Sequence, residues 1–271
     1  MPLTAFQKEV LAVLAKNRSE ASHFAGGLLL HADEHSARFS HDFDIFHEAG
    51  EEVVRASERD VESLLLAGFE VEKLGRTEAW EKEAVDFRRA RVRGVGGRVE
   101  IDWAADSAFR FFPIERDEQM GWRLHLFDMA VNKALALSAR TVTRDYVDIV
   151  ELGRRFPLAA ICWAAPGKDP GFNPLALLDM MRRFARIDPL QLDEIKARNL
   201  DPLVLKQDWT EMHVEAEEKM IRLADEQPDT PIGVAFVDAQ GRPGWLGDDP
   251  ALRPHAPCIR GCWPVVRSLD A

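Results

Sequence analysis

Two aspartates, Asp42 and Asp44, are separated by one residue in a segment whose other members are apolar. Because successive side chains of a strand point to opposite faces, a strand here puts both carboxylates on one face and Phe43 and Ile45 on the other. Two ionised carboxylates side by side repel each other, and a cation between them relieves that repulsion. Mg²⁺ suits the pair, since it takes oxygen ligands and is usually held by one or two carboxylates together with substrate phosphates. The pattern predicts a strand that carries a divalent-cation site.

A glycine pair, Gly26 and Gly27, lies fifteen to sixteen residues before Asp42, between a predicted strand and a predicted helix. Glycines let the backbone approach a phosphate closely, and the start of a helix offers unpaired N–H groups to it. The pair therefore predicts a phosphate-binding turn beside the cation site.

A third carboxylate would complete a two-metal site, and segment 99–103 offers two candidates. Alternation along a strand puts Glu100 and Asp102 on its polar face. We choose Asp102, because its apolar neighbours Ile101 and Trp103 fix its position better. Glu100 stays open as the alternative.

Basic side chains follow in the helical part of the sequence. Lys133 and Arg140 are seven residues apart and lie on the same side of a helix, where a lysine can reach phosphates as a compact charge. Arg144 and Asp148 are four residues apart, and a surface ion pair explains them equally well. Asp145 would sit in a first helical turn, where the helix dipole favours an acid.

Taken in order, these segments resemble the AbiEii/AbiGii-type nucleotidyltransferases, which belong to the DNA-polymerase-β-like nucleotidyltransferase superfamily. The resemblance covers roughly residues 20–155. It rests on Gly26-Gly27, Arg38-x-Ser40-x-Asp42-x-Asp44, the later Asp102, Asp128-Met-Ala-Val-Asn-Lys133, Arg140 and Arg144-Asp145-Tyr-Val-Asp148.

The resemblance implies a nucleotidyltransferase-like mixed β-sheet with helices, and transfer of a nucleoside monophosphate from an NTP such as ATP to a hydroxyl acceptor. It implies two Mg²⁺ ions per site. The implied metal ligands are Asp42, Asp44 and Asp102, which would act in catalysis together with Lys133. The implied nucleotide-binding residues are Gly26, Gly27, Arg38, Ser40, Lys133, Arg140 and Arg144.

The family also implies a toxin of an abortive-infection or toxin–antitoxin system, with the 3′ end of an RNA such as tRNA as acceptor and a cognate antitoxin as partner. Two alternatives stay open. One is the same chemistry on a small molecule or a protein. The other is a non-catalytic nucleotide- or partner-binding module, suggested by Leu28, which stands where the family commonly has Thr or Ser after the glycine pair.

Composition limits the choice of partner. The 271 residues carry a formal net charge of −11, which argues against non-specific coating of nucleic acid. A local run of arginines is the exception, and it reads equally well as a solvated hairpin or as a contact surface. Its members are Arg88, Arg89, Arg91, Arg93 and Arg98.

Cysteine number, the N-terminal sequence and hydropathy predict a cytoplasmic protein with no membrane partner. The three cysteines make no disulfide framework, the first residues do not read as a secretion signal, and no apolar run reaches membrane-spanning length. Two sets could ligate zinc but lack a further ligand, so we favour polar or structural roles for them. These are His31 with His35, and His255 with Cys258 and Cys262.

The periodicity predicts an α+β protein: a mixed core over 1–122, a helical domain over 123–226 and a proline- and glycine-rich extension over 227–271, short and irregular or β. Predicted helices cover 4–16, 28–35, 53–67, 124–138, 143–155, 175–185, 190–197 and 208–226. Predicted strands cover 22–25, 43–46, 69–73, 84–92, 98–104 and 233–237.

Overall fold

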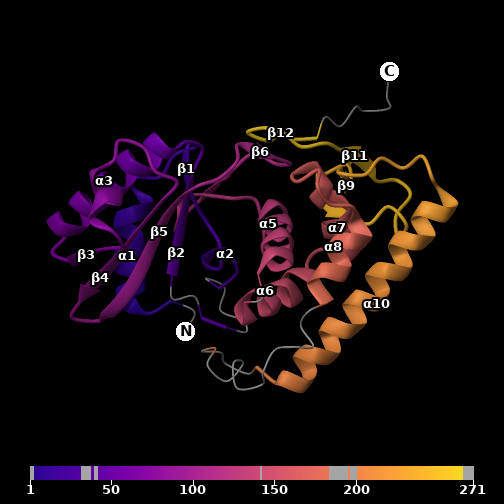
Figure 1. The fold of residues 1–271 in the computed structure, drawn as a ribbon, viewed down its shortest axis with the longest axis horizontal. Coiled ribbons are helices and arrows are strands. Elements are labelled where there is room, and N and C mark those ends of the chain that lie inside the picture. Colours follow the sequence, from indigo (N-terminus) through magenta and orange to yellow (C-terminus); the bar gives the residue numbers. More distant parts are fainter. Residues whose placement is uncertain are drawn as a thin grey trace. The chain divides into compact units, whose positions relative to one another are not determined.

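The computed structural model describes residues 3–31, 38–39, 42–140, 142–182, 195 and 200–264. By its contacts the chain divides into two compact units (Figure 1). Unit 1 comprises Met1–Ala108 and Ile114–His125, and unit 2 comprises Phe109–Pro113 and Leu126–Ala271. The three-part division expected from the sequence stays a prediction.

Unit 1 is built on a seven-stranded mixed sheet with the order β3-β4-β5-β2-β1-β8-β7. Its strands are β1 (Ser22–Ala25), β2 (Asp42–His47), β3 (Glu70–Leu74), β4 (Phe87–Gly94), β5 (Gly97–Ala105), β7 (Glu115–Asp117) and β8 (Gly121–Arg123). Strands β2 and β5 run parallel, and β2 pairs antiparallel with β1 on its other edge. The strand that carries both aspartates is therefore central, with a partner on each side.

Two of the helices of unit 1, α1 (Ala5–Ala15) and α3 (Gly50–Leu66), pack together on one face of this sheet (Figure 1). The helices of unit 1 are α1 (Ala5–Ala15), α2 (Leu28–His31), α3 (Gly50–Leu66) and α4 (Thr77–Glu81). Helix α1 begins at a capping box, in which Thr4 accepts from the backbone N–H of Gln7. Phe6 of α1 packs against the β4–β5 turn, where a Cβ on Gly94 would lie 2.7 Å from its ring. Glycine at this position lets the helix pack closely on the hairpin.

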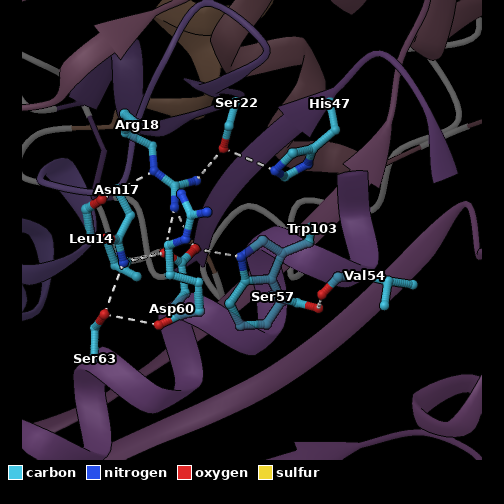
Figure 2. Close-up of polar contacts among 11 residues, drawn as sticks. Leu14, Asn17, Arg18, Ser22, His47, Val54, Ser57, Asp60, Ser63 and Trp103 are labelled. Carbon is cyan, nitrogen blue, oxygen red and sulfur yellow. Dashed lines mark hydrogen bonds and ion pairs between the residues drawn. The ribbon is translucent and has the colours of Figure 1, made fainter. Parts of the chain in front are cut away.

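A buried ion pair joins these helices to the strands (Figure 2). Arg18, just after α1, lies 2.5 Å from Asp60 of α3, and neither side chain is exposed. The indole N–H of Trp103, on β5, donates to the same carboxylate at 2.7 Å. Burial lowers the pKa of Arg18, and the charge of Asp60 opposes that shift. One carboxylate thus fixes α1, α3 and β5 together.

The same cluster reaches β1 and β2. Arg18 donates to the Ser22 hydroxyl at 2.9 Å, and that hydroxyl shares a hydrogen bond of 2.9 Å with His47 Nε2 (Figure 2). Burial, reinforced by the charge of Arg18, lowers the pKa of His47 to about 3. His47 is therefore neutral at ordinary pH and serves as a structural hydrogen-bonding group at the end of β2.

Unit 2 is mainly helical, with small sheets near its C-terminal end. Its helices are α5 (Leu126–Ala139), α6 (Thr143–Gly153), α7 (Leu158–Ala164), the 3-10 turn η1 (Ala165–Gly167), α8 (Pro174–Met181) and α10 (Pro202–Glu226). Its strands are β6 (Phe109–Arg110), β9 (Ala235–Val237), β10 (Pro243–Gly244), β11 (Arg253–His255) and β12 (Cys258–Ile259). Strands β10, β9 and β11 form one sheet, and β12 pairs with β6 in another.

The α+β expectation is confirmed, and most predicted elements are found within a few residues of their expected bounds. Helix α10 starts earlier than expected because Asp201 caps it and Pro202 occupies its first turn. Helix α7 escaped prediction because all of its residues are buried, which removes the amphipathic period. Predicted helix 190–197 lies outside the described residues except for position 195. No helix in the described ranges has the length and apolarity to cross a bilayer.

Candidate active site

The two aspartates of β2 and the two acids of β5 lie directly beside each other. In the parallel register, Asp42 is opposite Glu100 and Asp44 is opposite Asp102. Neighbouring strands are about 4.8 Å apart, so the backbone brings Asp44 and Asp102 into one row. Alternation is as predicted, since Phe43 and its neighbours of the same parity are buried while Asp42 and Asp44 are half-buried. Both candidates for the third carboxylate thus stand next to the pair.

Gly26 lies directly against the Asp44 carboxylate. Its φ is +65°, in the left-handed region, and a Cβ added there would lie 1.8 Å from Asp44 Oδ2. Ala25 is the register partner of Asp44 on β1, so the turn begins where the acidic strand is paired. Glycine is required at position 26 for its backbone conformation and for the room it leaves to the acid.

Leu28 and Arg38, which lie near the glycine pair in the sequence, are both buried. Leu28 is fully buried, so the position after Gly27 contributes to the core. Arg38 is buried, and its guanidinium donates to the Phe39 carbonyl at 3.2 Å. Ser40 lies outside the described residues.

Arginines of β4 neutralise the acids of β5. Arg89 is opposite Asp102 and Arg91 is opposite Glu100. Nε and Nη2 of Arg89 donate to the two carboxylate oxygens of Asp102 at 2.6 and 2.5 Å. Arg91 donates to Glu100 Oε1 at 2.7 Å and reaches Glu72 of β3 at 3.4 Å. Opposite charges therefore alternate across this face of the sheet, from β3 to β5.

The arginine run 88–98 does not form one surface, because the strand pleat divides it. Arg88 points to the helix face, is buried, and donates to the carbonyls of Ala79 and Trp80 at 3.1 Å. It thereby satisfies carbonyls at the end of α4 that have no partner within the helix. Arg93 instead pairs with Glu72 at 2.8 Å on the charged face.

In unit 2, Lys133 and Arg140 bind the buried acids of α6. Lys133 Nζ lies 2.8 Å from both Asp145 and Asp148, and Arg140 Nε lies 3.0 Å from Asp145. Burial opposes protonation of Lys133, but the charges of Asp148 and Asp145 raise its pKa overall. The interpretation of Asp148 as a surface acid is wrong, since its carboxylate is fully buried. Arg144 is exposed at the start of the same helix.

Asp128, the first residue of the D-x-A-x-x-K segment, has a structural role. Its carboxylate accepts from the backbone N–H groups of Phe111 and Phe112 at 2.9 Å each and lies 2.8 Å from Lys168 Nζ. It therefore anchors segment 109–113 to α5. The carbonyl of Phe111 lies 2.8 Å from His255 Nε2, which accounts for that histidine without a metal.

Within the described parts of the chain, no three His, Cys, Asp or Glu side chains converge to hold a metal ion as they stand. This includes the set His255, Cys258 and Cys262, whereas His35 lies outside those parts. At the acidic strands, the Asp102 carboxylate is turned into its ion pair with Arg89. The assignment of the aspartates as metal ligands stays a prediction.

The sequence interpretation treated Arg89 and Arg91 only as members of the arginine run, but their pairing with the acids of β5 could have been found from it. The turn that joins β4 to β5 pairs Gly94 with Gly97. Counting outward from that glycine turn puts Arg91 opposite Glu100 and Arg89 opposite Asp102. The partners of Lys133 gave no such signal, because they depend on how α6 packs on α5.

Comparison with known proteins finds no family model that matches the chain and no curated protein that matches it. Solved structures do match. MenT4, nucleotidyltransferase toxin Rv2826c from Mycobacterium tuberculosis H37Rv, is similar with a TM-score of 0.52 and 17% identity, over 79% of this chain and 82% of that chain. The chain therefore shares the fold of that structure.

A second match is JHP933 from Helicobacter pylori, with a TM-score of 0.51 and 17% identity, over 82% of this chain and 94% of that chain. The fold implied by the AbiEii-type resemblance is thus confirmed. At such low identity the likeness concerns the fold, and the chemistry has to be argued from this chain's own residues.

Proposed function

We propose that this protein is a Mg²⁺-dependent nucleotidyltransferase that transfers a nucleoside monophosphate from an NTP to a hydroxyl acceptor. The observation that carries the proposal is the row formed by Gly26, Asp44 and Asp102, with Asp42 on the same face of the sheet. A likeness in fold to a nucleotidyltransferase toxin supports it independently.

The donor chemistry of the acids on β2 and β5 suits a divalent cation. Asp42, Asp44 and Asp102 offer hard oxygen donors, and they lie on one face of two adjacent strands. Bound there, Mg²⁺ would lower the pKa of the attacking hydroxyl and balance the charge of the leaving pyrophosphate, with two ions per site expected.

The chain's own residues would do the positioning. Asp42 and Asp44 hold their place because Phe43 and Ile45 are buried on the opposite face of β2. The backbone at Gly26 and Gly27 would approach the triphosphate, since no side chain screens it there. In-line placement of donor and acceptor would then account for most of the rate.

Basic side chains would contact the phosphates. We assign Lys133 to the leaving pyrophosphate, with Arg140 and Arg144 assisting. Contacts with Asp145 and Asp148 support a fixed position for the lysine amine. Arg38 and Ser40 stay in the nucleotide-binding set on the strength of the family resemblance.

The acceptor we propose is RNA, such as the 3′ end of tRNA, in a toxin that a cognate antitoxin neutralises. The test incubates the protein with Mg²⁺, each labelled NTP and total RNA. Label on RNA supports the proposal, whereas label on small molecules or protein alone supports the alternative acceptor. Nucleotide binding without turnover in any mixture supports a non-catalytic module, which the buried Leu28 would also suit.

Isosteric variants test the row of acids. Asp42→Asn, Asp44→Asn and Asp102→Asn should each reduce transfer at least about 100-fold, because each removes charge from the metal ligands at constant shape. Glu72→Gln is the matched control, since Glu72 lies on β3 of the same sheet and pairs with Arg93. Growth arrest on expression, relieved by Asp44→Asn, would support the toxin assignment. Normal transfer by Asp44→Asn would refute the catalytic proposal.

A further inference from the structure

The ion pair between Arg89 and Asp102 occupies the carboxylate that the proposed function needs as its third metal ligand. Both oxygens of Asp102 accept a hydrogen bond from the guanidinium, at 2.6 and 2.5 Å. Such two-point, charge-assisted pairing fixes the plane of the carboxylate and is stronger than a single contact. A cation that approaches Asp102 therefore meets a positive charge already bound there.

Arg89 has a second carboxylate and an aromatic ring within reach when it leaves Asp102. Its Nη1 is 4.0 Å from Glu100, and its guanidinium lies over the Phe87 ring at 5.4 Å from the ring centre. The Arg89 side chain is 41% exposed, against 12% for Asp102, so the arginine has room to move while the acid is held. A small rotation would leave Arg89 on Glu100 and free both oxygens of Asp102.

We infer that Arg89 is a positioning residue that competes with divalent cations for Asp102 and so sets the cation affinity of the acidic row. This inference rests on the proposed function and concerns the regulation of the same site. Asp42 and Asp44 lie on the same face of the neighbouring strand, beside Asp102 and Glu100. Asp102 would become available to a cation when Arg89 moves toward Glu100.

The neighbouring arginine provides a matched control. Arg91 is on the same strand and the same face, and its pair with Glu100 lies opposite Asp42 in the sheet register. It bonds to a single oxygen of Glu100, at 2.7 and 3.1 Å, and has no hydrogen bond to Asp102 among its described contacts. Arg91→Gln thus removes the same charge from the same face without freeing Asp102.

The test measures Mn²⁺ binding at fixed ionic strength by the electron paramagnetic resonance signal of the free ion. We expect Arg89→Gln to tighten Mn²⁺ binding at least about fivefold, because a competing charge within hydrogen-bond distance is removed. Arg91→Gln should change binding less than about twofold. Adding Asp102→Asn to Arg89→Gln should abolish the gain. Circular dichroism tests whether each variant is folded. Arg89→Lys, which retains the charge, should show an intermediate gain in Mn²⁺ affinity. Together these controls separate competition from misfolding.

Equal gains in Mn²⁺ affinity in Arg89→Gln and Arg91→Gln would overturn the inference, because the loss of one positive charge from this face of the sheet would then explain both. Weaker binding by Arg89→Gln would overturn it as well, as would absence of Mn²⁺ binding in every variant. The proposed function can fail separately. A gain that depends on Asp102, without nucleotide transfer in any variant, supports competition and refutes transfer. Nucleotide transfer by the wild type, with an Mn²⁺ affinity that is unchanged in Arg89→Gln, supports transfer and refutes competition.

Discussion

At the scale of single residues, Gly26 shows how the acidic row constrains the backbone beside it. The position combines a left-handed φ with a carboxylate where a side chain would begin. These two constraints can be separated by substitution, because other glycines of unit 1 have a positive φ and open surroundings. Gly68, with a φ of +87°, has no atom within 4 Å of its virtual Cβ.

We predict that Gly26→Ala loses at least about 100-fold in nucleotide transfer, because its methyl group must push Asp44 out of the row. Gly68→Ala should cost about 1 kcal/mol of stability, from backbone strain alone, and leave transfer unchanged. Transfer assays and urea unfolding of both variants test this. Full activity of Gly26→Ala would mean that the position of Asp44 is unimportant.

His47 makes the stability of unit 1 depend on pH. Its pKa is about 3 when folded, against 6.5 for the free side chain, so between these values the unfolded chain binds a proton that the folded chain excludes. Stability is therefore lost as pH falls below about 6.5, by up to about 1.4 kcal/mol per pH unit.

The expected result is that His47→Gln, which keeps a polar group near Ser22, loses less stability on acidification than the wild type. Between pH 7 and pH 5 the gap between the two unfolding free energies should narrow by about 1–2 kcal/mol. Urea titrations at both pH values measure it. The His213→Gln variant is a useful comparison, since burial also lowers the pKa of His213, to about 4. A gap that widens on acidification would contradict the assignment.

At the scale of elements, β5 is fixed from both faces. Trp103 bonds to Asp60 on the helix face, and the preceding residue, Asp102, bonds to Arg89 on the other. Each bond holds the strand against rotation, and the pairing of β2 with β5 keeps the backbone of Asp102 opposite Asp44. The buried cluster around Asp60 is thus part of the support of the candidate site.

Asp60→Leu should lower the free energy of unfolding by about 3–5 kcal/mol, because Arg18 is left as an unpaired buried charge. Replacing Arg18 by Met in the same chain should recover much of that loss, since two apolar groups need no pairing. Thermal unfolding of the single and double variants gives the comparison. A double variant as unstable as Asp60→Leu would show that the other bonds of the cluster matter more than charge.

Local sequence predicted the elements well wherever the period was clear. Alternation alone put Asp42 and Asp44 on one face of β2, and the strands predicted over 84–92 and 98–104 form the β4–β5 hairpin. What local patterns could not predict are the contacts between elements distant in sequence. The pairing of Arg18 with Asp60, and of Lys133 with Asp148, depends on how helices pack. The sequence shows that Leu28 departs from the Thr or Ser that the family commonly has after the glycine pair, but it does not show that Leu28 is buried.

At the scale of the whole molecule, the net charge is −11 with every arginine counted, and the arginine run adds little net positive surface. Arg91 and Arg93 face carboxylates across the sheet, so their charges are already balanced. We predict that the Arg91→Gln and Arg93→Gln double variant binds RNA within about twofold of the wild type, with an unchanged salt dependence. Each arginine that contacts a phosphate would instead add about 0.7 to the slope of log affinity against log salt. Filter binding between 50 and 200 mM salt measures this slope. A slope that is lower by about 1.4 in the double variant would mean that both arginines contact RNA phosphates.

The pairing of β2 with β5 also determines where this chain tolerates added length. One residue inserted after Glu100 would turn over the rest of β5, carrying Asp102 to the helices and the Trp103 indole to the charged face. One residue inserted beside Val95, which is fully exposed at the hairpin tip, lengthens the turn and leaves both strands in phase. Engineered insertions beside Val95 should therefore leave the sheet intact, whereas insertions after Glu100 should disrupt it.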